Sequence, residues 1–106
     1  MDCLFCKIAA REIPVELVWE GDGLMAFKDK YPKAPVHVLI IPVHHIESLA
    51  QTTPADMAML GKLLAAVPLV AEQVGLRERG FKTVINTGVE GGQEVPHLHV
   101  HVLGGG

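Results

Sequence analysis

The stretch that decides the fold is Pro96-His97-Leu98-His99-Val100-His101-Val102-Leu103, close to the C-terminus. Three histidines alternate with aliphatic residues, and side chains two apart on a β-strand share one face. The alternation predicts a strand with all three imidazoles on one side and its aliphatic side chains in the core. Three aligned rings would repel one another when protonated and would be costly to bury without partners. Because imidazole serves as metal ligand, nucleophile and acid–base group, both a metal site and a phosphoryl-transfer site fit the pattern better than a plain polar face.

The length and composition are those of a small globular protein. The chain has 106 residues, so we expect a single domain over residues 1–106. A net charge of −3 argues against nucleic acid or an anionic membrane surface as the main partner. We see no apolar run near the length that spans a bilayer and no signal-peptide pattern, so we expect a cytoplasmic protein.

The order of elements predicts an α+β fold with a mainly antiparallel five-stranded sheet, one long helix and a short N-terminal helix. The short helix covers residues 3–11. The long helix begins with Thr53 as N-cap, ends at Gly75, and should kink or split near Val67 because of Pro68. The final glycines, 104–106, read as an unstructured end. The expected strands are residues 17–20, 24–27, 37–41, 81–86 and 98–103.

Two further motifs carry chemistry. The glycine-bearing loop 86–94 leads into the histidines, and its backbone N–H groups could bind an anion. Cys3 and Cys6 form a Cys-x-x-Cys pair, which in a reducing compartment is more typical of metal ligands or redox thiols than of a structural disulfide. A pair of unpaired thiols in a helix remains the plain alternative.

Taken together, these blocks resemble the histidine triad (HIT) nucleotide-binding proteins, and within them the Hint-type purine nucleoside phosphoramidases. The resemblance runs from Cys3-Leu4-Phe5-Cys6 through Ile41-Pro42-Val43-His44-His45 and Val84-Ile85-Asn86-Thr87-Gly88 to the histidine stretch. It implies a HIT-like fold and hydrolysis of nucleoside 5′-phosphoramidates to nucleoside monophosphates. In that reaction His99 would attack the α-phosphorus and form a nucleotidyl-histidine intermediate, which water then releases.

The resemblance also implies roles for the surrounding residues. His101 would contact the phosphate and help to protonate the leaving group, while His97 and His37 would support the other histidines. No cofactor would be required for catalysis, and the ligand would be a purine nucleotide of the AMP or GMP type. The nucleotide-binding residues would be Phe5, Ile8 and Phe27 around the purine, Asp29 at the ribose, and Asn86, Gly92, Gln93 and Glu94 near the phosphate.

Some relatives hold a structural zinc ion, and the matching positions here are Cys3, Cys6, His45 and His97. Two cysteines and two histidines form a closed tetrahedral set, which leaves the nucleophile free. The resemblance further implies a homodimer, for which the long apolar helix and an edge strand could supply a two-fold interface.

The chain departs from the family pattern at two places. Glu94 stands where many phosphoramidases have a serine, and a carboxylate would repel an anionic phosphate unless it turns away or binds a cationic amine. The chain also stops at Gly106, where relatives often continue into a tail. Two alternatives therefore stay open: a nucleotide-binding or scaffolding protein with weak or no turnover, and a catalytic metal held by His97, His99 and His101.

Overall fold

Five strands form one sheet in the computed structural model, which describes residues 3–106. The strand order is β1-β2-β3-β5-β4, and every neighbouring pair is antiparallel. The predicted α+β fold, with one long helix and one short N-terminal helix, is confirmed. The strands are β1 (Leu17–Gly21), β2 (Leu24–Lys28), β3 (Val36–Pro42), β4 (Lys82–Val84) and β5 (Val100–Gly104).

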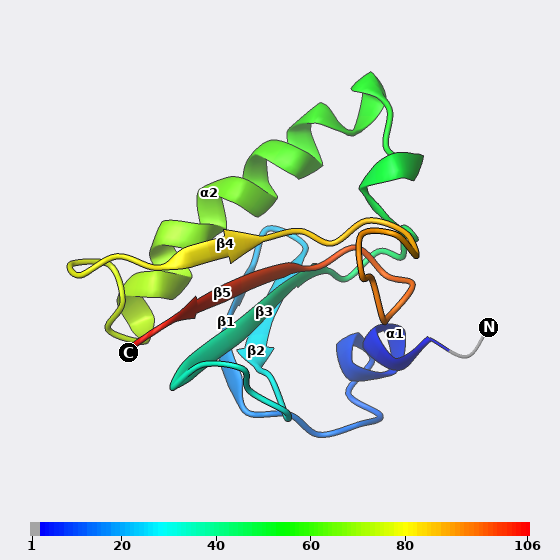
Figure 1. Cartoon of the computed structure of the whole chain (residues 1–106). Coiled ribbons are helices and arrows are strands. Elements are labelled where there is room, and N and C mark those ends of the chain that lie inside the picture. The colour runs from blue at the N-terminus through cyan, green and yellow to red at the C-terminus, as the bar shows by residue number, and fades with distance from the viewer. Residues whose placement is uncertain (1–2) are drawn as a thin grey trace.

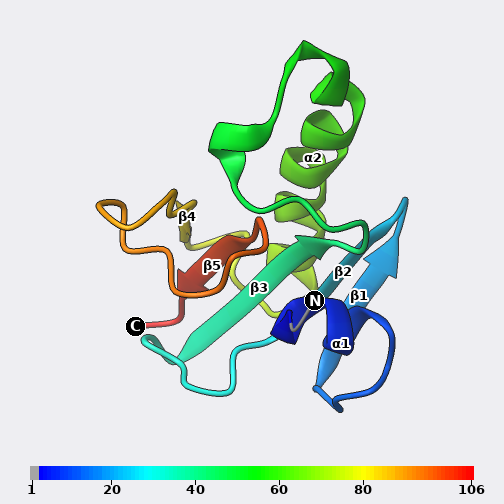
Figure 2. The same cartoon turned by 90° about the vertical axis from the view of Figure 1, so that its right-hand side faces the viewer.

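The two helices lie on opposite faces of the sheet (Figures 1 and 2). The long helix α2 (Met57–Gln73) packs on one face, and the short helix α1 (Leu4–Ala9) lies against the other. Because successive strand residues alternate, the central strand β3 is buried on both sides: Ile40 packs in the core beneath α2, and Ile41 packs in the core beside α1. The sheet is thus a common wall between two hydrophobic cores.

Residues in the left-handed backbone conformation set the limits of the first elements. Asp22 and Gly23 have φ values of 55° and 76°, so they form the two-residue turn of the β1–β2 hairpin. Arg11 has a φ of 66°, which is incompatible with continuing a right-handed helix. Helix α1 therefore ends at Ala9, two residues before the predicted limit.

Helix α2 begins and ends where the sequence predicts. Thr53 and Asp56 form a reciprocal capping box around a first 3₁₀ turn, and Gly75 ends the helix with a φ of 76°. The helix continues through Pro68 without being split, although proline lacks the N–H that would bond to Leu64.

The segment Pro54–Gln73 corrects the expectation that no apolar run comes near the length that spans a bilayer. An 18-residue window of this 20-residue segment has a mean hydropathy of 1.4, so by length and composition alone it could cross a membrane. A core helix passes the same test, and this one buries an inner stripe against the sheet. Its inner stripe consists of Leu63, Ala66, Val67, Val70 and Ala71.

The last two strands differ from the predicted ranges. Strand β5 begins at Val100, and β4 covers only residues 82–84. The backbone before β5 leaves the sheet because the Leu98 N–H donates to Ile46 O, at 2.8 Å, and not to a neighbouring strand. At the other end, Gly104 belongs to β5 and pairs with Val36, so the predicted unstructured end is wrong at this residue. A Cβ there would approach the Leu76 side chain to 3.0 Å, which explains a glycine.

Candidate functional site

The three histidines share the face of the sheet that carries α1. Leu98, Val100 and Val102 pack beneath α2, so the histidines between them point to the opposite side, as the alternation predicts. Only His101 lies within β5. The ring of Phe5, from α1, contacts the rings of His97 and His99 at centroid distances of 5.9 and 5.0 Å. The short N-terminal helix thus covers the histidines and excludes solvent from them.

Hydrogen bonds define which nitrogen of His99 carries the proton. His99 Nδ1 lies 2.7 Å from the backbone carbonyl oxygen of His97. A carbonyl only accepts, so His99 Nδ1 carries the proton and donates it. In a neutral imidazole the other nitrogen, Nε2, then has a free lone pair. His99 is buried and lines a large cavity, so the residue that carries this free lone pair lies at the cavity wall.

A second chain of bonds orients His101. The Lys33 N–H donates to His37 Nδ1 at 3.0 Å, so neutral His37 carries its proton on Nε2. His37 Nε2 lies 2.9 Å from His101 Nδ1 and 3.4 Å from an Asp29 carboxylate oxygen. His101 Nδ1 therefore accepts, and its own proton lies on Nε2. His99 thus has an unprotonated Nε2 and His101 has a protonated Nε2, and the centroids of the two rings lie 4.9 Å apart.

Burial keeps these rings neutral. It is the main cause that lowers the pKa of His37, His97 and His99 below the ordinary value. For His101, burial together with the adjacent rings of His99 and His37 lowers the pKa from 6.5 to about 4. Uncharged imidazoles that can attack or exchange a proton are the consequence at neutral pH.

A cavity of about 940 Å³ opens over His99 and His101. Its walls combine apolar side chains with a few polar groups, as is typical of a small-molecule site. The predicted nucleotide-binding residues that line it are Phe5, Ile8, Phe27, Asp29, Asn86, Gly92 and Glu94.

Gln93 is not among the residues that line this cavity. Its side-chain amide donates to the carbonyls of Glu47 and Val95, and its oxygen accepts from the Gly88 N–H. One of these bonds joins the glycine loop to the loop after β3, and the other two lie within the segment 88–95, so the Gln93 side chain holds the glycine loop in place. Asn86 does line the cavity, and its amide also donates to Gly91 O within the loop.

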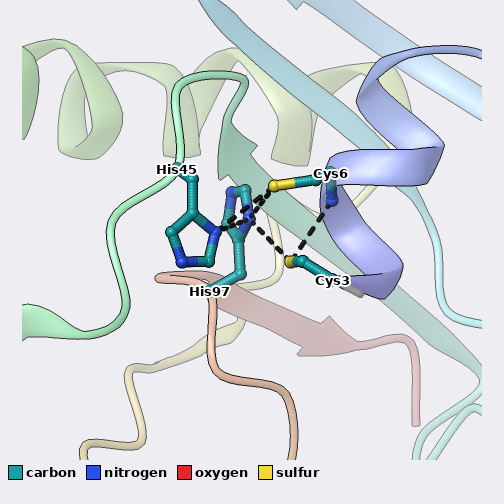
Figure 3. Close-up of side chains that lie close together, drawn as sticks. All are labelled: Cys3, Cys6, His45 and His97. Carbon is teal, nitrogen blue, oxygen red and sulfur yellow. Dashed lines mark hydrogen bonds between the residues drawn. The ribbon is translucent and has the colours of Figure 1, made fainter. Parts of the chain in front are cut away.

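Cys3, Cys6, His45 and His97 converge on one point between α1 and the loops (Figure 3). The two Nδ1 atoms lie 3.2 Å apart, and Cys3 Sγ and Cys6 Sγ lie 3.3 and 3.6 Å from His97 Nδ1. A tetrahedral zinc site separates nitrogen ligands by about 3.3 Å and nitrogen from sulfur by about 3.5 Å. The four side chains fit a metal site of that size.

The backbone also supports this cluster. His97 Nε2 donates to the carbonyl oxygen of Pro42 at 2.7 Å, which leaves the His97 Nδ1 lone pair directed toward the sulfurs. Ligand histidines usually have such a partner on their second nitrogen. Sequence reasoning missed Pro42 because a backbone carbonyl has no residue-type signal.

A catalytic metal on His97, His99 and His101 is not supported by the geometry. Within residues 3–106, the groups that could hold a metal are the cysteine–histidine cluster and a second set, Asp29, His37 and His101. In the second set, His37 Nδ1 accepts the Lys33 N–H with its lone pair. The proton of neutral His37 therefore lies on Nε2, which has no lone pair to offer a cation. Lys33 is the second contact that sequence reasoning missed, because its contribution is also a backbone group.

Comparison with known proteins settles the family. A family model described as HIT domain matches residues 10–106. This chain belongs to the HIT family. The HIT chain is 52% identical to Protein HitA of Neisseria gonorrhoeae over 103 residues, which cover 97% of this chain and 95% of that protein.

Two other relatives are informative for the HIT chain. It is 40% identical over 104 residues to the purine nucleoside phosphoramidase of Escherichia coli K12, covering 98% of this chain and 87% of the relative. It also resembles a crystal structure of a HIT family hydrolase from Legionella pneumophila Philadelphia 1, with 44% identity, a TM-score of 0.94, and coverage of 98% and 93%. These similarities support a nucleotide-binding hydrolase of the HIT family.

The low pKa of His101 predicts a pH-dependent stability. Between about 4 and 6.5 the unfolded chain binds a proton at His101 that the folded chain does not, so the free energy of unfolding falls as the pH is lowered through this window. One such group contributes at most about 1.4 kcal/mol per pH unit. His101→Gln should therefore show a shallower pH dependence in urea unfolding measured from pH 7 to 5. Equal slopes for both proteins would contradict the assigned pKa.

Proposed function

We propose that this HIT protein hydrolyses nucleoside 5′-phosphoramidates to nucleoside monophosphates and amines. The proposal rests on the assigned tautomers of two residues that line the cavity: His99 has an unprotonated Nε2 and His101 has a protonated Nε2. A buried neutral imidazole is a competent nucleophile, and a nearby N–H can protonate a leaving nitrogen. The similarity to a purine nucleoside phosphoramidase supports the same reaction class.

The reaction takes place in two halves. His99 Nε2 attacks the α-phosphorus, the phosphorus–nitrogen bond breaks, and its electron pair stays on the amine nitrogen. That nitrogen takes its proton from Nε2 of His101, which the anionic phosphate of the bound substrate would hold in its imidazolium form. His101 is left as a neutral imidazole, and the free amine leaves. Water then attacks the nucleotidyl-histidine and passes a proton back to His101 Nε2, while the electron pair of the phosphorus–His99 bond returns to the imidazole. Covalent catalysis thus replaces one difficult displacement with two easier ones.

His97 and His37 act as positioning residues in this scheme. The His97 carbonyl holds the His99 ring by accepting from His99 Nδ1. The His37 Nε2–H holds the His101 ring by donating to His101 Nδ1. Asp29 lies at the cavity wall, where its carboxylate can accept hydrogen bonds from ribose hydroxyls. Phe5, Ile8 and Phe27 supply an apolar wall for a purine, and Asn86 and Gly92 lie where a phosphate would approach. Gln93 serves the same site by holding the loop.

We also propose that Cys3, Cys6, His45 and His97 bind a structural zinc ion. The fit of the donor distances and the supporting bond from His97 to Pro42 favour it. When bound, zinc would tie α1 and the loop after β3 to the segment before β5. It would leave His99 and His101 free, so catalysis would need no metal in the cavity.

A homodimer is the third part of the proposal. The outer side of α2 exposes Met57, Leu64 and Leu69, and β4 is an edge strand of the sheet. An apolar helix face and an unpaired strand edge are both surfaces that proteins commonly cover. A two-fold axis beside them would bury both surfaces at once.

His99→Ala tests the nucleophile. We expect hydrolysis of a fluorogenic adenosine phosphoramidate to fall by at least about a thousandfold, while AMP binding and the fold persist. His44→Ala is the matched control because His44 is exposed and belongs to neither cluster. Wild-type turnover should survive a chelator in the assay. If wild type binds AMP without turning over the phosphoramidate, the chain is a binding protein and the hydrolase proposal fails.

The zinc proposal predicts about one zinc per chain by elemental analysis after expression in zinc-containing medium. Cys3→Ser combined with Cys6→Ser should remove it and lower the temperature of unfolding, because the ion would no longer stabilise the folded state. His45→Asn should weaken binding, whereas His44→Asn should not. Wild-type protein that stays zinc-free after incubation with one equivalent of zinc would rule the site out.

The dimer proposal predicts a solution mass of twice 11.4 kDa in light scattering. Leu64→Glu places a charge on the exposed side of α2 and should shift the protein to the monomer. Val89→Glu is the control, because Val89 is also exposed but lies in the glycine loop. A monomeric wild type, or a dimer that Leu64→Glu leaves intact, would contradict this interface.

A further inference from the structure

Several charged residues around the main cavity already have a partner within the chain. Lys28 pairs with Glu16 at 2.7 Å. The Asp29 carboxylate accepts the Tyr31 N–H at 2.9 Å and lies 3.4 Å from His37 Nε2. The ammonium of Lys30 lies 5.9 Å from the centre of the Tyr31 ring, within reach of a cation–π interaction.

Glu94 and Lys33 are different from these groups. Both line the cavity, and they approach each other from two separate loops with 3.8 Å between Nζ and the carboxylate. The side chains are 80% and 68% exposed. An exposed ion pair of this length contributes about 0–1 kcal/mol. An incoming charged group can therefore replace either partner at little cost.

The backbone beneath Glu94 is firmly held. The side chain of its neighbour Gln93 makes three hydrogen bonds, to the Gly88 N–H and to the carbonyls of Glu47 and Val95. The Glu94 backbone is therefore fixed at the cavity, while its exposed side chain can meet a ligand.

The chemistry of the substrate determines which group meets this carboxylate. The nucleotide half carries the negative phosphate, and its proposed contacts are Asp29, Asn86 and Gly92. The amine half must leave past His101 toward the mouth. A carboxylate there disfavours anions and favours cations, because an opposite charge within about 4 Å is attractive even near solvent.

We propose that Glu94 is a specificity-determining residue that selects leaving amines with a cationic group in addition to the nitrogen bonded to phosphorus. Lys33 is its counter-ion in the free protein, and the ammonium of the leaving group replaces Lys33 on binding. This inference rests on the proposed phosphoramidase function and names the substrate class for it: nucleoside phosphoramidates of diamines and similar cationic amines.

The test uses three adenosine 5′-phosphoramidates of similar length, whose distal group is an ammonium, a methyl or a carboxylate. Wild type should show kcat/KM in the order ammonium, methyl, carboxylate, with the first preferred to the second by about two- to fivefold, which is the range expected of an exposed ion pair. Glu94→Gln should bring this ratio close to one. Higher salt should reduce it in wild type because exposed charges are screened.

Two variants separate this effect from general charge and from Lys33. Glu90→Gln removes the same charge from the same loop, but Glu90 does not line the cavity, so the ratio should stay at the wild-type value. Lys33→Met frees Glu94 and keeps the N–H that bonds His37, so the ratio should rise.

The outcomes distinguish the two proposals. Wild type that hydrolyses none of the three substrates defeats the proposed function and this inference with it. Wild type that hydrolyses them with a ratio near one, or a ratio that Glu94→Gln leaves unchanged, overturns only the role of Glu94.

Discussion

The bond between His99 Nδ1 and the backbone carbonyl of His97 is the interaction on which the site depends. It fixes the tautomer of His99 and therefore the lone pair available at Nε2. The same residue, His97, faces the cysteine–histidine cluster with Nδ1 and donates to Pro42 O with Nε2. One buried residue thus connects the metal-binding group, the end of β3 and the proposed nucleophile. A shift in any of these three would move the ring of the proposed nucleophile.

Burial is the second constraint. The sheet separates two cores, and the histidines lie on the side that only the short helix α1 covers. Phe5 contacts two of the rings, and burial lowers the pKa of each histidine in the triad. A bare histidine strand facing water would titrate near its ordinary value and would be partly protonated at neutral pH. The small helix therefore contributes to the chemistry as well as to packing.

Two loops from distant parts of the chain complete the cavity. The loop between β2 and β3 supplies the Lys33 N–H that orients His37, and the glycine loop supplies Asn86, Gly92 and Glu94. Gln93 holds the second loop through bonds that leave it no free polar group. A fixed loop that carries an exposed charged side chain fits the proposed site, in which the nucleotide is constant and the leaving group varies.

The sequence by itself determined the fold class, the hairpin, the limits of α2 and the face on which the histidines lie. These features follow from local periodicity, capping and turn chemistry, which act between residues close in the chain. Tertiary structure alone decided where β5 begins, that Gln93 faces the loop and not the ligand, and which nitrogen of each histidine carries the proton. The start of β5 depends on the Ile46 carbonyl, the placement of Gln93 on the Glu47 carbonyl, and the histidine protons on backbone groups of Pro42, His97 and Lys33. A backbone group is the same in every residue except proline. Residue type therefore has no signal for them, and only the folded chain brings donor and acceptor together.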